Sequence, residues 1–174
     1  MKPISLYSTQ HKLLYRGVHA NVREALEQCV RDKINLDRVH LSGANLKNVE
    51  LDGWRVTGAK LTRCNLRGAN FSEAFLRHCD FSYCDLSEVC FCYSDLTHCD
   101  FRHAKWRETD FSQAKIDHSS FDCMAPKIVD LSRCYSAEHL KIHDGMDIAE
   151  LPAFLLTNLH PEVEQNHRGE NPRV

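Results

Sequence analysis

Hydrophobic residues recur at every fifth position, without interruption, from Leu36 to Phe121. A second series, of mostly small residues, lies two positions before each of them, and the positions between are largely polar. An α-helix repeats about every 3.6 residues and a strand every two, so a period of five fits neither element. A sustained short repeat of this kind predicts a solenoid in which every coil buries the same two positions.

The two inward positions of each repeat are separated by one residue, which suits a short extended segment, and the remaining residues must turn a corner. The central hydrophobic residues are Leu36, Leu41, Leu46, Leu51, Val56, Leu61, Leu66, Phe71, Leu76, Phe81, Leu86, Phe91, Leu96, Phe101, Trp106, Phe111, Ile116 and Phe121. The residues that precede them by two are Ile34, Val39, Ala44, Val49, Trp54, Ala59, Cys64, Ala69, Ala74, Cys79, Cys84, Val89, Ser94, Cys99, Ala104, Thr109, Ala114 and Ser119.

Many of these repeats have the form Ala-Asp/Asn-Leu-x-x, with Cys or Ser replacing Ala and Phe replacing Leu. Matches are Ala44-Asn45-Leu46, Cys64-Asn65-Leu66, Ala69-Asn70-Phe71, Cys79-Asp80-Phe81, Cys84-Asp85-Leu86, Ser94-Asp95-Leu96 and Cys99-Asp100-Phe101. Over residues 34–135 the chain resembles the pentapeptide repeat family. That resemblance implies an all-β solenoid, a right-handed quadrilateral β-helix with one pentapeptide on each side.

The phenylalanines offer a separate check on the number of sides. From Phe71 onward the central residue is Phe in every second repeat, and Leu, Trp or Ile occupies the repeats between. An even number of sides stacks these rings on two opposite faces, whereas three sides would mix them with the other residues. Four sides are therefore expected, with coils about 4.8 Å apart in a rod roughly 20 Å long.

The two ends of the chain depart from the repeat. Residues 1–33 predict a strand and helix cap, because residues 21–30 carry an amphipathic stripe and Asn21 with Glu24 resembles a capping box. Trp54 is too large for its small-residue position, and it either packs under this cap or distorts the coil.

After Phe121 the repeat breaks at Pro126 and partly resumes before residue 136. Residues 136–160 predict C-terminal helices that cap the last coil, and residues 161–174 a flexible tail. Capping alone is one interpretation of these helices, and the alternative is that their apolar residues also join two rods in a homodimer. The residues expected at such a dimer contact are Leu151, Phe154, Leu155 and Leu159.

Length and composition fit one soluble domain of 174 residues with no transmembrane span or secretory signal, so a cytoplasmic location is expected. Several of the nine cysteines occupy the small inward position, where a thiol packs as a compact hydrophobe. These are Cys64, Cys79, Cys84, Cys99 and Cys134. Stacked pairs are close enough for oxidation, but parallel side chains and a reducing compartment argue against disulfides.

The outward residues are where a function must lie. The side centred on Leu51, Phe71, Phe91 and Phe111 carries four acids and no Lys or Arg, while the other sides mix both signs. The acids are Glu50, Asp52, Glu73 and Asp110. They predict a binding surface, with ordinary solvation as the alternative. A basic groove is absent, so direct nucleic-acid binding is not expected.

The family resemblance implies a role for this acidic side. In the best-known activity of the family the rod is similar to duplex DNA in width and charge and occupies the DNA channel of a type II topoisomerase, and some members protect gyrase from quinolones or inhibit it. This chain departs from the quinolone-resistance type, because no loop interrupts its repeats and its acidity is low.

Two further features have residues that can bind metals. His78, His98 and His118 fall at the same corner of successive coils, where imidazoles can hold a transition metal or merely stack in solvent. Cys90 and Cys92 flank the inward Phe91, and a Cys-x-Cys on a regular strand is weak evidence for metal or redox chemistry. Neither forms a complete site, so no metal or cofactor is expected.

Catalysis is not expected either. The glycines at the last repeat position, Gly43, Gly53, Gly58 and Gly68, suit corners that need a permissive backbone rather than a phosphate loop. A filled rod predicts no concave pocket, and no Ser, His and acid constellation can be assembled. The chain is therefore interpreted as a non-enzymatic binding protein.

Two functions follow from that interpretation. The first is a DNA-mimicking inhibitor or protector of a DNA-processing enzyme, either topoisomerase-like or a host factor targeted by a phage or mobile element. The second is a general protein-interaction scaffold without DNA mimicry, which uses its sides or its terminal helices. Both require a protein partner, and neither requires nucleic acid or a membrane.

Overall fold

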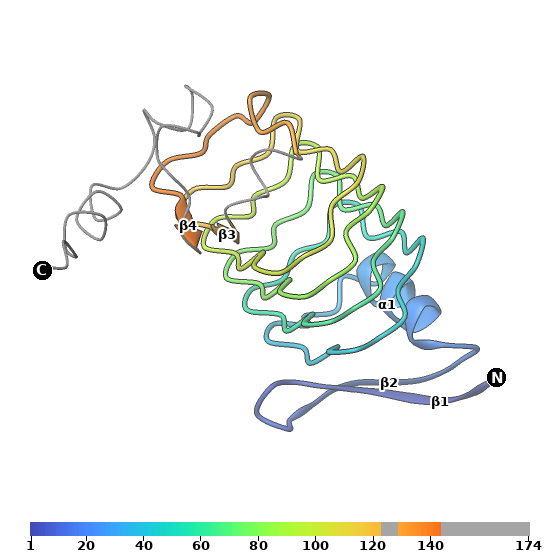
Figure 1. The fold of residues 1–174 in the computed structure, drawn as a ribbon. Coiled ribbons are helices and arrows are strands. Elements are labelled where there is room, and N and C mark those ends of the chain that lie inside the picture. Colours follow the sequence, from blue (N-terminus) through green and yellow to red (C-terminus); the bar gives the residue numbers. More distant parts are fainter. Residues whose placement is uncertain (123–128, 144–174) are drawn as a thin grey trace, which may run out of the picture.

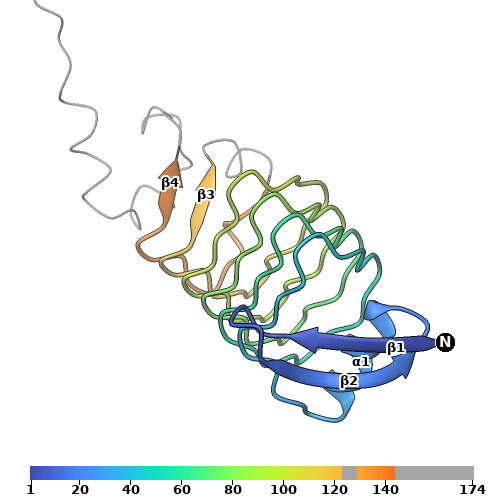
Figure 2. The same cartoon turned by 90° about the horizontal axis from the view of Figure 1, so that it is seen from below.

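The computed structural model describes residues 1–122 and 129–143. The chain begins with an antiparallel hairpin of β1 (Lys2–Tyr7) and β2 (Leu13–His19), followed by helix α1 (Val22–Arg31). A stack of coils follows, and the parallel pair β3 (Ser120–Asp122) and β4 (Lys141–His143) lies at its far end. Figure 1 shows the hairpin and α1 at one end of this stack and β3 and β4 at the other, and Figure 2 gives the view from below. Within the described residues no helix is long and apolar enough to cross a membrane.

Parallel bridges join residues that are 20 apart in the sequence, from His40–Lys60 to Asp100–Ser120. Each coil therefore contains 20 residues. One pentapeptide occupies each side, which confirms the four-sided prediction. Side A is centred on Leu36, Val56, Leu76, Leu96 and Ile116, and side B on Leu41, Leu61, Phe81, Phe101 and Phe121. Side C is centred on Leu46, Leu66, Leu86 and Trp106, and side D on Leu51, Phe71, Phe91, Phe111 and Leu131.

From Arg38 to His118 each corner is a tight turn whose third residue has a left-handed backbone. On side D, for example, the Trp54 amide donates to the Leu51 carbonyl at 3.1 Å, with Gly53 at φ 63° between them. The corner glycines Gly43, Gly58 and Gly68 have φ values of 68–75°, as predicted. Most other corners hold a residue with a Cβ, for which the left-handed conformation costs about 1–2 kcal/mol.

The phenylalanines form two interior stacks, as predicted. On side B the ring centroids are 5.2 Å apart for Phe81 and Phe101 and 5.0 Å for Phe101 and Phe121. On side D, Phe71, Phe91 and Phe111 stack at 5.4 and 5.1 Å. The two stacks meet edge to face across the core at 5.6–6.4 Å, an arrangement that contributes about 0.5–1.5 kcal/mol per pair beyond area burial.

The inward cysteines pack as small donors. Cys64, Cys84 and Cys99 are buried free thiols whose Sγ atoms donate to the carbonyls of Leu41, Leu61 and Leu76 at 2.8–3.0 Å. The donor–acceptor separation of 23 residues recurs where Thr109 and Ser119 fill the same position and donate to Leu86 and Leu96. This position therefore suits a small side chain that can donate one hydrogen bond to a backbone carbonyl. Cys79 is buried and free as well, whereas Cys134 is half-buried, and burial raises its pKa to about 12.

The N-terminal segment begins as the sequence predicts. Asn21 caps α1 by accepting from the Glu24 amide at 3.0 Å, while the Glu24 carboxylate accepts from the Ala20 amide at 3.0 Å. The helix buries Ala25, Leu26 and Cys29 in the common core. The hairpin joins the first coil through the His40 amide, which donates to the Tyr7 carbonyl at 2.8 Å.

The described part of the predicted C-terminal helical segment is not helical. Residues 136–143 continue the coil, because Ala137 and Leu140 fill inward positions and the bridges Lys115–Ser136 and Ser120–Lys141 carry on the ladder. The separation rises from 20 to 21 residues at a bulge, where the amides of Tyr135 and Ser136 both donate to the Ala114 carbonyl. The predicted tail and dimer contact, with the rest of the helical segment, lie outside the described residues.

Candidate functional site

Side D carries the acids that the sequence singled out. Glu50, Asp52, Glu73 and Asp110 are all exposed on it. The last coil adds an exposed Asp130 and also a base, Arg133, because Leu131 continues side D one coil beyond Phe111. We call the five acids Glu50, Asp52, Glu73, Asp110 and Asp130 the acidic strip. Its far end is therefore less acidic than its start.

The acids of the strip differ in their local roles. Asp110 accepts from both the amide and the hydroxyl of Ser112, and these bonds, with a smaller contribution from Arg133, lower the pKa of its carboxyl group. Asp130 makes the same pair of bonds to Ser132. These two aspartates hold their corners in place.

The other three acids of the strip carry their charge outward. The Glu50 carboxylate accepts from the Asn70 amide group at 3.0 Å, and in the described part of the chain Asp52 and Glu73 form neither a hydrogen bond through their carboxylates nor an ion pair. Glu50, Asp52 and Glu73 therefore remain available to an external cation.

On each of the other sides at least one acid is paired with an arginine. On side C the Glu88 carboxylate forms ion pairs with Arg67, at 2.8 Å, and with Arg107. Arg77 contacts Asp95 at 2.6 Å on side A, and Arg102 contacts Asp100 at 2.7 Å on side B. Among the described residues, no ion pair includes a member of the acidic strip.

The charge density of the strip is far below that of DNA. Duplex DNA carries one charge per about 1.7 Å, or roughly 12 over the length of the rod. Side D carries five acids and one arginine over coils about 4.8 Å apart. It therefore presents a local acidic surface rather than a continuous copy of a duplex.

The predicted histidine ladder forms and has one more member. His78, His98, His118 and His139 stack with centroids 4.6–4.9 Å apart and ring planes within 10° of parallel. The sequence pattern missed His139 because the Tyr135 bulge moves it one residue out of register. Burial, with the positive charge of neighbouring histidines, lowers the pKa of His98. In the described ranges no group of three or more His, Cys, Asp or Glu side chains is arranged to hold a metal ion.

Cys90 and Cys92 lie half-buried on side D as free thiols. Burial, reinforced by contacts with Cys90 and Asp110, raises the pKa of Cys92 to about 12. A thiol that stays protonated at neutral pH is a poor nucleophile and a poor metal ligand. The geometry therefore adds no support for a redox or metal role at Cys92.

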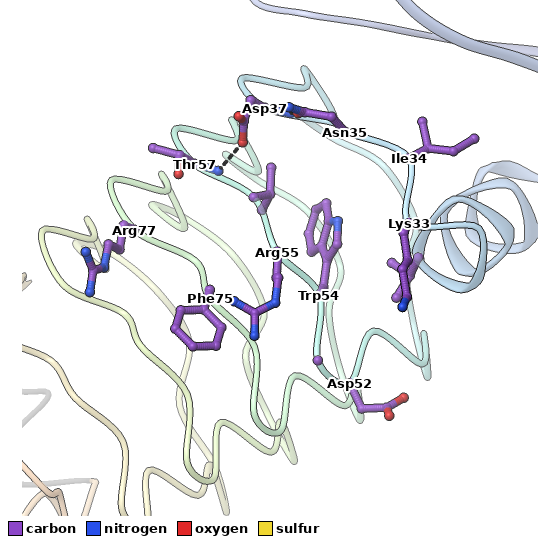
Figure 3. Close-up of a pocket in the computed structure, with 13 residues that line it drawn as sticks. Lys33, Ile34, Asn35, Asp37, Asp52, Trp54, Arg55, Thr57, Phe75 and Arg77 are labelled. Carbon is purple, nitrogen blue, oxygen red and sulfur yellow. Dashed lines mark hydrogen bonds between the residues drawn. The ribbon is translucent and has the colours of Figure 1, made fainter.

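A pocket of about 820 Å³ lies on side A, between the end of α1 and the second coil. The prediction that the rod has no concave pocket is wrong at this end. Its residues include Val30, Lys33, Ile34, Asp37, Asp52, Trp54, Arg55, Thr57, Phe75 and Arg77, most of which are labelled in Figure 3. The feature of the sequence that pointed to an irregularity here was Trp54, which is too large for its small-residue position. Its side chain is buried in the core and stacks on Phe71 at 6.4 Å.

The repeat geometry agrees with what known proteins show. The pentapeptide repeat region matches residues 55–125, and the eight-copy pentapeptide repeat matches residues 32–63. The chain belongs to the pentapeptide repeat family. Proteins of this family fold as right-handed quadrilateral β-helices and are generally non-enzymatic. No curated protein matches the chain significantly.

The chain matches several solved pentapeptide repeat structures, and over most of its length it resembles one of them in fold. The protein alr5209 from Nostoc Pcc 7120 is 21% identical with a TM-score of 0.50, and the match covers 69% of this chain and 94% of that one. HetL from Nostoc sp. Strain PCC 7120, involved in heterocyst differentiation regulation, is 20% identical with a TM-score of 0.25 over 48% and 52% of the two chains. QnrB1, a plasmid-mediated fluoroquinolone resistance protein, is 18% identical in its trypsin-treated form, with a TM-score of 0.33 over 48% and 55%.

Proposed function

We propose that this pentapeptide repeat protein is a non-catalytic binding protein that engages a basic surface of a protein partner through the acidic strip. The observation that carries the proposal is the contrast between side D and the other sides. Glu88, Asp95 and Asp100 on the other sides are paired with arginines at 2.6–2.8 Å, and those sides also carry bases that form no ion pair in the described part of the chain. Glu50, Asp52 and Glu73 are exposed, form no ion pair within the described residues, and lie on a side with no base before Arg133. Uncompensated charge on one side favours an oppositely charged partner.

The narrower form of the proposal identifies that basic surface as the DNA-binding surface of a DNA-processing enzyme. The enzyme would be topoisomerase-like or a host factor that a phage or mobile element disarms. The strip carries less than half the charge density of a duplex, so contact would be limited to a patch of the enzyme rather than its whole channel. Duplex DNA should then compete with the protein for the enzyme.

A protein-interaction scaffold without DNA mimicry is the second candidate. Arg133 and the exposed Tyr93 on side D favour it, because a mixed surface with an aromatic residue 67% exposed suits ordinary protein contacts. Binding of this kind would be little affected by salt and would not be displaced by duplex DNA.

The test compares captures from a bacterial lysate by the intact protein and two charge-reversal variants. Glu50→Lys/Glu73→Lys alters the strip at positions that do not hold a corner through their side chains. Glu108→Lys/Glu138→Lys makes the same charge change at exposed positions on sides C and A. The proposal expects the first variant to lose the partner and the second to keep it. Equal capture by both variants would contradict it.

A further inference from the structure

The ladder of parallel bridges has one gap where the coil begins. On the other three sides the first coil pairs with the second, at His40–Lys60, Asn45–Asn65 and Glu50–Asn70. On side A the first bridge is Arg55–Phe75, one coil later. Among the described residues no bridge joins Asn35 to Arg55.

The gap leaves backbone groups without partners. On side B the Leu41 amide donates to the Lys60 carbonyl at 2.9 Å, and the Lys60 amide donates to the Val39 carbonyl at 2.8 Å. The equivalent bonds of Arg55, from the Leu36 amide and to the Ile34 carbonyl, are absent from the described part of the chain. Arg55 thus presents a free N–H and a free C=O in strand geometry.

The gap is local and coincides with the pocket on side A. The coils rejoin two residues later, where the Arg38 amide donates to the Thr57 carbonyl at 2.8 Å and the Thr57 amide donates to Asp37 Oδ1 at 2.8 Å. Figure 3 shows the Trp54 ring standing between the Arg55 segment and the segment of Lys33 and Ile34. The bulk of that ring at a position built for a small residue accounts for the separation.

Trp54 adds an unpaired donor to the pocket. Its side chain is almost fully enclosed, with the residue 2% exposed, and its Nε1 has no hydrogen-bond partner among the described residues. A buried donor without an acceptor is destabilising, so an acceptor brought in by a ligand would be bound favourably there.

The charges at the pocket favour an anion. Arg77 is already paired with Asp95, and Asp37 accepts from the Thr57 amide. Lys33 and Arg55 are exposed and form no ion pair in the described ranges, while Asp52 lies at the rim. The Arg55 guanidinium lies 4.0 Å from the centre of the Phe75 ring, which holds its charge over the pocket wall.

We propose that this pocket binds a short extended peptide carrying an acidic side chain, supplied by a protein partner. The peptide backbone pairs with the free N–H and C=O of Arg55, its carboxylate lies beside Lys33 and Arg55, and one of its carbonyls reaches Trp54 Nε1. The paired donor and acceptor of Arg55 favour a peptide over a simple anion, since only a peptide presents both groups at strand spacing. This site lies on side A, and its proposed peptide contacts are Lys33, Trp54 and Arg55; of the acidic strip only Asp52 reaches its rim.

The test uses capped heptapeptides that differ only in carrying Asp and Glu or Lys and Arg at alternate positions. The protein contains two tryptophans, so a Trp106→Phe background leaves Trp54 as the sole reporter of binding by fluorescence. Acidic peptides should bind and shift the Trp54 emission, and basic peptides should not. Lys33→Glu should weaken binding at least about ten-fold, whereas the matched variant Lys60→Glu on side B should have no effect.

Further binding measurements distinguish a peptide site from an anion site. N-methylation of the central peptide amide removes a backbone donor and should weaken binding by roughly five-fold or more. Trp54→Phe, followed by calorimetry, should weaken binding by a similar factor. Equal binding of acetate or inorganic phosphate, with no effect of N-methylation, would overturn the proposal, as would an absence of acidic preference. Glu50→Lys/Glu73→Lys should leave peptide binding unchanged, which keeps this site distinct from the proposed function.

Discussion

At the scale of single residues, the corners carry both the strain and the surface chemistry of this rod. The third turn residue has positive φ whether it is Gly53, Glu73, Tyr93 or His98. Its side chain points away from the filled interior, and at Glu73 a residue proposed for binding also has a strained backbone. The glycines at this position could be predicted from the sequence, whereas corners occupied by Glu or Tyr carry no comparable sequence signal, because these residues have no preference for positive φ.

A glycine substitution separates strain from packing. A Cβ added to Gly53 would meet no atom within 4 Å, so Gly53→Ala should lose only the left-handed preference. The expected loss is about 1 kcal/mol in the free energy of unfolding, measured by urea denaturation. Gly53→Asn should lose less, because asparagine tolerates this conformation better. An alanine variant as stable as the wild type would contradict this account of the corner.

A core phenylalanine tests the interior stacks. Phe101 is fully buried between Phe81 and Phe121, so Phe101→Ala should lower the free energy of unfolding by about 3–5 kcal/mol. Phe75 is 40% exposed, and Phe75→Ala is the matched control, with an expected loss of about 1 kcal/mol or less. Similar losses in both variants would show that the stack adds nothing to stability.

At the scale of elements, an amphipathic stripe and a capping box predicted helix α1. The period of five predicted the sides and the two phenylalanine stacks, because both depend on which residues are buried. It could not predict the Tyr135 bulge, which turned an expected helix into the last part of the coil and brought His139 under His118. Nor could it predict the missing Asn35–Arg55 pair, because the repeat does not show how the coil accommodates the large Trp54 ring (Figure 3). Asp110 was assigned to binding, but its bonds to Ser112 show that it also builds its corner.

The histidine column predicts a pH dependence of stability. The pKa of His98 in the folded protein is lowered below its ordinary value of 6.5, by burial first and then by His78, His118 and Lys141, against an opposing effect of Asp117. The unfolded chain therefore binds a proton more readily than the folded one, and stability falls as pH drops below 6.5 toward the folded pKa.

Urea denaturation at about pH 7.5 and about pH 5.5 measures this loss. His98→Asn removes the imidazole at a left-handed position and should reduce the loss on acidification. His11→Asn is the control, because His11 also has positive φ, at 61°, and lies outside the column. An unchanged pH dependence in His98→Asn would rule out the column as its source.

At the scale of the whole molecule, the rod has two unlike ends and one side whose acids remain unpaired. The hairpin and α1 close one end, and the dimer contact expected at Leu151, Phe154, Leu155 and Leu159 remains a prediction for the other. Deletion of residues 161–174 should leave the oligomeric state unchanged, whereas Phe154→Asp/Leu155→Asp should convert a dimer to a monomer. Light scattering of the intact protein checks this, and a monomer at high concentration would contradict the dimer.

The most direct test of the proposed function is the affinity of the captured partner, titrated at low and high salt against the wild type and Glu50→Lys/Glu73→Lys. We expect the wild type to bind more weakly as salt is raised, because charges on an exposed strip are screened over about 10 Å at 0.1 M salt. The variant should bind at least about ten-fold more weakly at low salt, with the difference shrinking at high salt. Equal affinities for the two proteins at low salt would contradict a binding role for the acidic strip.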